Sequence, residues 1–304
     1  MLKENKHKMT ICTALFLLTA LLFSSCSVKN VETNIFDDVE QFFADKTLLK
    51  LSVLMDKMGI KKTEFKNITF SSDGEKNWYY QNHCKSHYSE DKNILVFEMS
   101  SYESFGETVF VIFEKRDAKY LQRDYLESSS KYEHSLLSFW PKTNNIPVFS
   151  ITSQSGGTGC NSSTISFYQY KTGKAAEMLN LKLYDRCSTC RIPHEYKGEI
   201  SFSEKEIKVV YDINVSAIGG YYESAYKDIP WKFNLFKTTR ESVYKWSTSK
   251  QKYIYDPASQ VPEQSEDLFN DKSFVKYFKS ELAEVKKTGD KYQREWVEKM
   301  FGGN

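Results

Sequence analysis

Two cysteines that are close in the sequence have a spacing suited to chemistry. Cys187 and Cys190 enclose two residues, as do the cysteines of redox dithiols and of many zinc sites. In thioredoxin-like folds such a pair begins a helix, which lowers the pKa of the first thiol. Here residues 181–184 are strand-like, and a helix is not expected to start at residues 191–193, which are Arg-Ile-Pro. This context argues against redox catalysis of the thioredoxin kind.

Zinc binding is the second hypothesis for the same pair. His194 follows it closely, and His83, Cys84 and His87 could supply further ligands. This second group does not have the spacing of a regular zinc knuckle. The sequence therefore predicts no metal site, and no other cofactor is expected.

Disulfide bonds are the third hypothesis. Cys84, Cys160, Cys187 and Cys190 are an even number of cysteines, which indicates disulfides in an oxidising compartment, and four cysteines allow three connectivities. Residues 160–190 fit a hairpin whose first strand begins at Cys160 and whose second strand ends near Cys187 and Cys190, so the cysteines lie at its two chain ends. We therefore expect a bridge from Cys160 to Cys187 or Cys190, with free thiols as the alternative.

Other motifs that would indicate catalysis are incomplete or missing. Residues 155–159, Ser-Gly-Gly-Thr-Gly, lack the Lys of a P-loop and the spacing of a dinucleotide-binding loop, which leaves a β-turn or a bulge. Gly-x-Ser-x-Gly and His-Glu-x-x-His do not occur. Ser128 and Lys131 have the spacing of a Ser/Lys acyl-transfer pair, but its companion motifs are missing. We predict no catalytic residue.

The first 25 residues have the pattern of a signal peptide. Three lysines and a histidine precede an uncharged apolar run over residues 11–23, and two serines follow it. This run of 13 residues is shorter than the roughly 20 that a membrane-spanning helix needs, and no later stretch approaches that length. We therefore expect an exported protein without a transmembrane helix.

The end of this segment, Ser24-Ser25-Cys26, resembles the lipobox of bacterial lipoproteins. The resemblance covers residues 1–26 and departs from the family at Phe23, where Leu is usual. It implies that Cys26 is the first residue of the mature protein and carries a thioether-linked diacylglycerol, usually with an N-acyl chain. Several acyl chains anchor a protein stably in a membrane. The alternative is an ordinary signal peptide followed by an incidental cysteine.

The residues after Cys26 indicate where the lipoprotein is sorted. By resemblance to enterobacterial lipoproteins, Ser27 in place of Asp favours the outer membrane. Residues 28–32 lack the acidic cluster that promotes surface display in some bacterial groups, which favours the periplasmic face. Without residues 1–25 the chain has 39 basic and 39 acidic side chains, so its charge gives no reason to expect a nucleic acid as partner.

The pattern along the mature chain predicts one β-rich domain between helical segments. Residues 26–33 form a tether, and residues 34–59 have the apolar spacing of one or two helices that end at Gly59. Residues 60–256 contain short apolar runs of strand length, such as residues 94–97 and 109–113, and alternating stretches, such as residues 207–213, separated by turn residues. Such strands without intervening helices predict an antiparallel sandwich, a barrel or a partial propeller.

The end of the chain returns to a helical pattern. A linker is expected over residues 257–264, and two short helices over residues 265–304. Gly289 separates them, and Asp290 with Gln293 resembles a capping box at the start of the second helix. We expect the apolar faces of these helices to pack on the β domain. These faces carry Phe274, Phe278, Leu282, Val285, Tyr292, Trp296 and Met300.

Two stretches, residues 145–174 and 240–256, faintly resemble blades of bacterial FG-GAP-like propeller proteins. In each stretch the resemblance depends on one strand. In the first, residues 165–168 follow a Gly-rich turn; in the second, Tyr244 and Trp246 form a Tyr-x-Trp pattern. The acidic calcium loop of that family, Asp-x-Asp-x-Asp-Gly, does not occur. The resemblance implies only the partial propeller named above.

Composition and motifs together favour a protein that binds rather than catalyses. Aromatic residues make up 15% of the chain, and their alternating positions indicate half-buried strands more than glycan-stacking platforms. We expect a lipid-anchored envelope protein whose partner is another envelope protein, an incoming toxin that it neutralises, or a glycan. An envelope hydrolase with an unrecognised active site is the alternative.

Overall fold

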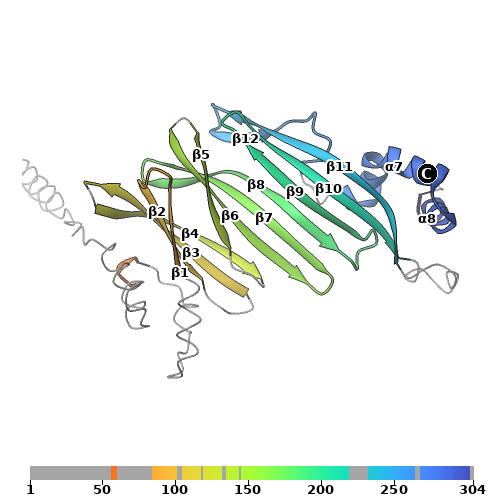
Figure 1. Cartoon of the computed structure of the whole chain (residues 1–304), viewed down its shortest axis with the longest axis horizontal. Helices are drawn as coiled ribbons and strands as arrows, with labels where there is room; N and C mark the ends of the chain where they lie inside the picture. The colour runs from red at the N-terminus through yellow and green to blue at the C-terminus, as the bar shows by residue number, and fades with distance from the viewer. Residues whose placement is uncertain are drawn as a thin grey trace, which may run out of the picture. The chain divides into compact units, whose positions relative to one another are not determined.

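The computed structural model describes eight stretches of the chain: residues 56–59, 84–100, 105–117, 119–131, 135–143, 145–218, 232–263 and 268–301. All of them belong to one compact unit, Ile35–Asn304. The described residues form two antiparallel sheets followed by three helices (Figure 1). The predicted signal peptide, Cys26 and the predicted tether lie outside the described residues.

The first sheet contains four strands, each paired with its neighbour in the chain. The apolar runs predicted as strands, residues 94–97 and 109–113, lie in its two central strands, β2 and β3. Every side chain of β2 is buried, as a continuous apolar run predicts for a strand that is covered on both faces. The strands are β1 (Cys84–Tyr88), β2 (Ile94–Ser100), β3 (Phe105–Arg116) and β4 (Lys119–Lys131).

The second sheet is a meander of eight strands in the order β12-β11-β10-β9-β8-β7-β6-β5. Two-residue turns join β6 to β7 and β7 to β8; Thr172 and Gly173 between β7 and β8 both have positive φ angles, as a type I′ turn requires. The strands are β5 (Leu136–Thr143), β6 (Ile146–Gly157), β7 (Cys160–Lys171), β8 (Lys174–Cys187), β9 (His194–Phe202), β10 (Glu206–Ile218), β11 (Lys232–Ser247) and β12 (Lys252–Tyr255).

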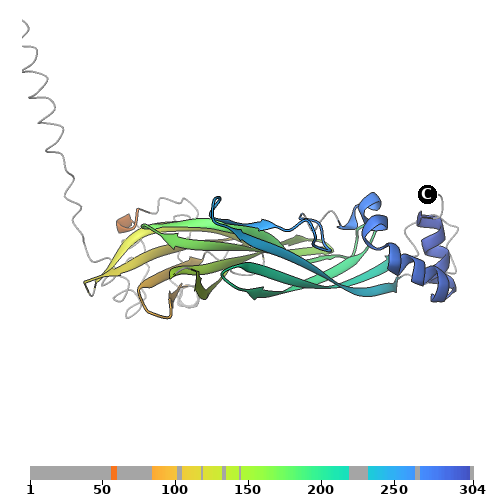
Figure 2. The same cartoon turned by 90° about the horizontal axis from the view of Figure 1, so that it is seen from above.

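The two sheets share a core, which makes the fold sandwich-like. β4 contacts β6 and β8, and β1 contacts β5, so the first sheet covers one end of the second; Figure 2 shows them there as two layers. Outside the core, Lys142 Nζ of β5 lies 2.6 Å from Asp91 Oδ2 in the β1–β2 turn. The core between the sheets consists of Ile94, Val96, Phe110, Ile112, Leu137, Phe149, Ile151 and Tyr170.

This architecture confirms the mainly β, antiparallel prediction and corrects its propeller alternative. The strands predicted as blades, residues 145–174 and 240–256, are hairpins of one continuous sheet. Separate blades would need the pairing to stop after each short group of strands, whereas β5 to β12 pair without interruption. Among the described residues both sheets are open, so the barrel alternative does not apply either.

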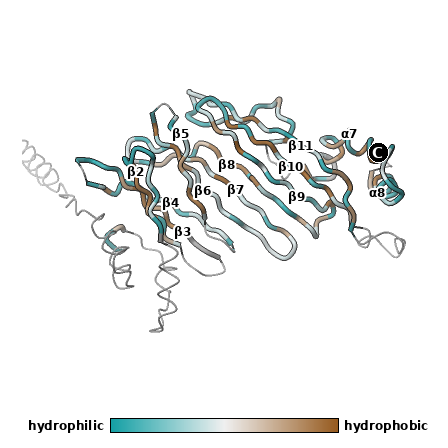
Figure 3. The backbone as a smooth tube through the Cα atoms, in the orientation of Figure 1, coloured by the Kyte–Doolittle hydropathy of each residue, from teal (hydrophilic) through white to brown (hydrophobic). Residues whose placement is uncertain are grey.

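Alternating residues along the strands explain which face of the second sheet is buried. In β10 the odd-numbered residues from Ile207 to Val215 are all buried, as the sequence predicted. Figure 3 shows the hydrophobic colour recurring along these strands. The large aromatic side chains follow the same rule: Phe149, Phe167, Tyr196 and Tyr211 are at most 2% exposed. They therefore fill the core, as the composition indicated.

Three helices close the chain: α6 (Asp271–Tyr277), α7 (Lys279–Thr288) and α8 (Lys291–Phe301). Phe278 separates α6 from α7, where the sequence predicted one helix. The predicted capping box forms, with mutual hydrogen bonds of 2.8 and 2.9 Å between Asp290 and Gln293. The apolar face packs on the sheet through contacts such as Phe278 with Phe236 of β11. Each buried large side chain stabilises this docking by about 1.5–3 kcal/mol.

Two predicted segments at the edges of the domain are described in part. Residues 257–263 lie along β11: the Gln260 amide donates to the Glu241 carbonyl, and Val261 is buried. In the N-terminal segment only residues 56–59 are described; Met58 is buried against β4, and Gly59 has a φ of +73° after the last helical residue. The rest of the predicted helix lies outside the described residues. No helix in the described part of the chain is both long and apolar enough to span a membrane.

Candidate functional site

The β7–β8 hairpin brings Cys160 and Cys187 together. These two residues are direct partners across the pair of strands. The register that starts at the turn would place Cys160 opposite Asp185, but two bulges on β8, at Met178 and Leu183, each add one residue. The bulges therefore decide that a cysteine faces Cys160.

The disulfide in the structure joins Cys187 to Cys190, whose Cα atoms are 5.6 Å apart, and Cys160 is a free thiol. This corrects the connectivity expected for Cys160. The tight turn after β8 returns the chain within three residues, so both members of the Cys-x-x-Cys pair reach each other. The expected proximity is nevertheless found: Cys160 Sγ lies 2.6 Å from Cys187 Sγ. As predicted, no helix begins here, because residues 188–193 form a turn into β9.

The turn that carries Cys190 is fixed to the neighbouring β6–β7 hairpin. Both the amide and the hydroxyl of Ser188 donate to the Gly159 carbonyl, over 2.8 and 2.9 Å. Gly159 has a φ of +83°, and a Cβ there would lie 2.6 Å from Thr189 Cγ2. The Gly-rich segment predicted as a turn or a bulge, residues 155–159, ends β6 and then forms this hairpin turn with its last two residues, and Gly159 allows the two turns to touch.

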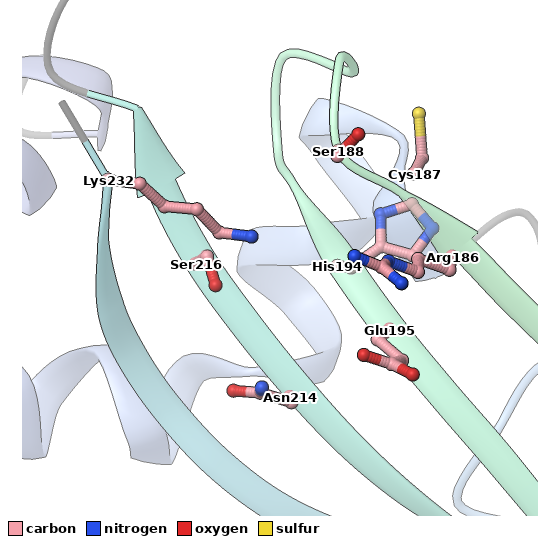
Figure 4. Close-up of a pocket in the computed structure, with 8 residues that line it drawn as sticks. All are labelled: Arg186, Cys187, Ser188, His194, Glu195, Asn214, Ser216 and Lys232. Carbon is pink, nitrogen blue, oxygen red and sulfur yellow. The ribbon is translucent and has the colours of Figure 1, made fainter. Parts of the chain in front are cut away.

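A small polar pocket lies next to the cysteines, on β8 to β11 (Figure 4). Its volume is about 40 Å³, enough for a water molecule or a similarly small group. Lys232 and Arg186 extend over it with Glu195, while the Cys187 sulfur points away (Figure 4). Positive side chains outnumber the single carboxylate on this wall. The lining residues are Arg186, Cys187, Ser188, His194, Glu195, Asn214, Ser216 and Lys232.

His194 forms the buried floor of this region. Its ring lies parallel to Phe269, with the centroids 3.5 Å apart. Nδ1 lies 2.8 Å from the Ile192 carbonyl oxygen, and Nε2 lies 3.4 Å from Asp185 Oδ2. Because both ring nitrogens have protein partners, the position of His194 fits a structural role better than the zinc ligation considered from the sequence.

Asn214 and Tyr184 give the pocket and its surroundings their polar character. Asn214 Oδ1 is a buried acceptor without a hydrogen-bond partner among the described residues. Such an atom costs free energy unless a donor reaches it. The Tyr184 hydroxyl donates to Glu195 Oε1 over 3.3 Å, and partial burial together with this carboxylate raises the pKa of Tyr184. The region therefore presents acceptors beside the cationic side chains of Arg186 and Lys232.

Other residues singled out from the sequence lie away from the three cysteines. Cys84 and His87 are in β1, where His87 Nε2 lies 2.7 Å from the buried carboxylate of Glu98. Ser128 and Lys131 are three residues apart on β4, so their side chains point to opposite faces and do not form an acyl-transfer pair. His83 and Cys26 lie outside the described residues.

Sequence reasoning did not find the pocket residues Asn214, Ser216 and Lys232. They meet Glu195 only because β9, β10 and β11 are neighbours in the sheet. The one available signal is the polar residues at alternate positions of β9 and β10, which indicate the exposed face but not a pocket.

Comparison of the chain with protein-family models, with curated proteins and with solved structures found no match.

Proposed function

We propose that this chain is an exported lipoprotein, anchored through Cys26 in the outer membrane, whose β domain binds another protein of the cell envelope. The anchor rests on the lipobox resemblance at residues 24–26. The binding role rests on one observation: the exposed face of β8 to β10 carries charges of both signs in neighbouring positions.

The pairing of the strands defines this charged face. Arg186 lies opposite Glu195, and in the adjacent row Lys197 lies opposite Asp212. All four side chains are exposed. We refer to Arg186, Glu195, Lys197 and Asp212 as the charged face. The polar pocket described above opens beside it.

A protein partner suits the charged face better than a glycan does. Alternating charges favour a surface with the complementary pattern, and they exclude wrong partners by like-charge contacts. A glycan site would be expected to expose several aromatic rings, whereas Phe167 and Tyr211 of this sheet are buried, and the half-buried Tyr184 opposite Lys197 is hydrogen-bonded to Glu195. An envelope protein or an incoming toxin would each offer such a surface.

Site-specific photo-crosslinking in bacterial cells tests this proposal. A crosslinking amino acid at Lys197 should give one discrete adduct with an envelope protein. The same amino acid at Ser249, which is exposed in the β11–β12 turn, is the matched control and should not give that adduct. Reversing a charge beside the probe, with Asp212→Lys, should lower the yield by about tenfold, equivalent to about 1.4 kcal/mol of binding free energy.

The proposal is wrong if Lys197 and Ser249 give the same adducts, or if the Asp212→Lys change leaves the yield unaltered. Adducts that depend on position but not on charge would likewise contradict the role of the charged face.

A further inference from the structure

Three sulfur atoms meet where β7 begins and β8 ends. The Sγ atoms of Cys160, Cys187 and Cys190 all lie within 4.8 Å of one another. Cys187 and Cys190 form the bridge, and Cys160 is the thiol. Because three sulfurs hold only one disulfide among themselves, one thiol always remains in this cluster.

We propose that the cluster is a thiol–disulfide exchange site in which Cys160 and Cys190 compete for Cys187. The Cys160 thiolate attacks Cys187 Sγ, the Cys160–Cys187 bond forms as the Cys187–Cys190 bond breaks, and Cys190 leaves as the thiolate. The proton lost by Cys160 goes to solvent, and Cys190 takes one up from solvent. The number of disulfides does not change, so the step consumes no oxidant or reductant.

The backbone accommodates both bridges without rearrangement. Cys187 and Cys190 have Cα atoms 5.6 Å apart, within the usual range for a disulfide. Cys160 and Cys187 are direct cross-strand partners, and such partners have Cα atoms about 4.5–5.5 Å apart, which is also within that range.

The surrounding turns hold the attacking thiol in place. Ser188 binds the Gly159 carbonyl through its amide and its hydroxyl, so residues adjacent to Cys160 and to Cys187 are joined directly. Cys160 Sγ also lies 3.6 Å from Thr189 Oγ1. A nucleophile that is fixed in this way reacts at a high effective concentration.

The exchange changes which sulfur faces solvent. Cys187 is buried in the structure, Cys160 is partly exposed, and Cys190 is exposed. When Cys160 takes over the bridge, the free thiol moves to the exposed turn. There its thiolate can attack a disulfide of another molecule: the S–S bond of that molecule breaks, one half forms a mixed disulfide with Cys190, and the other half leaves as a thiolate, so the substrate class is a disulfide.

Oxidised glutathione is the probe for this reaction. The whole chain, purified in detergent without reductant, is incubated with it, quenched with acid and mapped as peptides under non-reducing conditions. We expect glutathione on Cys160 in some molecules and on Cys190 in others. Cys160→Ser should lower the adduct on Cys190 at least about tenfold, because Cys190 then stays bonded to Cys187. Cys84→Ser is the matched control, and it should leave both adducts unchanged.

Three outcomes would overturn the proposal. The first is an adduct on Cys160 alone in the unaltered chain, a result that needs no variant to fold. The second is a Cys190→Ser variant in which Cys160 and Cys187 remain unbridged. The third is metal analysis that finds zinc bound with all three thiols free, which would make the cluster a metal site.

Discussion

At the scale of single residues, an ion pair between Arg240 of β11 and Glu281 of α7 joins the C-terminal helices to the sheet. Both side chains are less than one-fifth exposed. Burial opposes ionisation of Glu281, but hydrogen bonds from Thr238 and Ser280 and the charge of Arg240 outweigh it and lower the pKa of this carboxyl. Arg240 also lies over the Phe278 ring, 5.8 Å from its centroid.

We predict that Glu281→Gln lowers the free energy of unfolding by about 1–3 kcal/mol, because it leaves the Arg240 guanidinium partly buried without its counter-charge. Replacing both partners, Arg240→Met with Glu281→Leu, should cost less than Glu281→Leu alone. Urea unfolding measures these differences.

The exposed pair Lys286–Glu298 is the matched control, and Lys286→Met should change the free energy of unfolding by no more than about 0.5 kcal/mol. Equal losses for Glu281→Gln and this control would contradict the prediction.

Residue-level prediction from the sequence succeeded for local contacts and for the proximity of Cys160 to Cys187, but it gave neither the disulfide connectivity nor the register behind that proximity. Asp290 and Gln293 are three residues apart, so their capping box follows from local geometry. Cys160 faces Cys187 only because of bulges at Met178 and Leu183. A bulge is favoured by packing across the sheet, which the spacing of residues does not reveal.

At the scale of elements, the turn between β1 and β2 is tied to β5 of the other sheet. Asp91 Oδ2 in that turn lies 2.6 Å from Lys142 Nζ. Partial burial alone would raise the pKa of Asp91, but hydrogen bonds from Lys142, Ser89 and Asn93 outweigh it and hold this pKa well below its usual range. A carboxyl with a lowered folded pKa stabilises the protein above its unfolded pKa, and this contribution is lost as the pH falls.

We predict that Asp91→Asn lowers the free energy of unfolding at pH 7 by up to about 1 kcal/mol, the range for a partly exposed pair. The difference between the variant and the unaltered chain should diminish as the pH falls below about 4, the ordinary pKa of an aspartate. Urea unfolding at a series of pH values measures it. A difference that stays constant down to the acid limit, or that grows there, would contradict the role of the Asp91 charge.

The elements themselves could be predicted better than their arrangement. The alternation in β10 and the apolar runs of β2 and β3 predicted these segments as strands. Burial of one face gives alternating apolar residues, and burial of both faces gives a continuous apolar run. The order of the strands and the break at Phe278 depend on contacts between distant residues. For that reason two isolated hairpins could be mistaken for propeller blades.

At the scale of the whole molecule, the described residues form one sandwich-like unit that offers two neighbouring features. The charged face on β8 to β10 carries the proposed binding role, and the three cysteines at the end of β8 carry the proposed exchange chemistry. The charged face needs the strand order, so it could not be located from the sequence. The cysteines could be placed together from the expected hairpin, but their register and the Cys187–Cys190 connectivity could not be predicted. The proposed export signal is a linear pattern, so it can be proposed from the sequence without the fold.

Metabolic labelling with a fatty-acid analogue tests the central claim, that the chain is anchored through Cys26. Bacterial cells producing the chain or a variant are labelled and fractionated. We predict label on the unaltered chain, recovered with the outer membrane, and no label and no membrane recovery for Cys26→Ser. Cys84→Ser, the matched control, should keep its label. Label that persists on Cys26→Ser, or an unaltered chain that carries none, would contradict the claim.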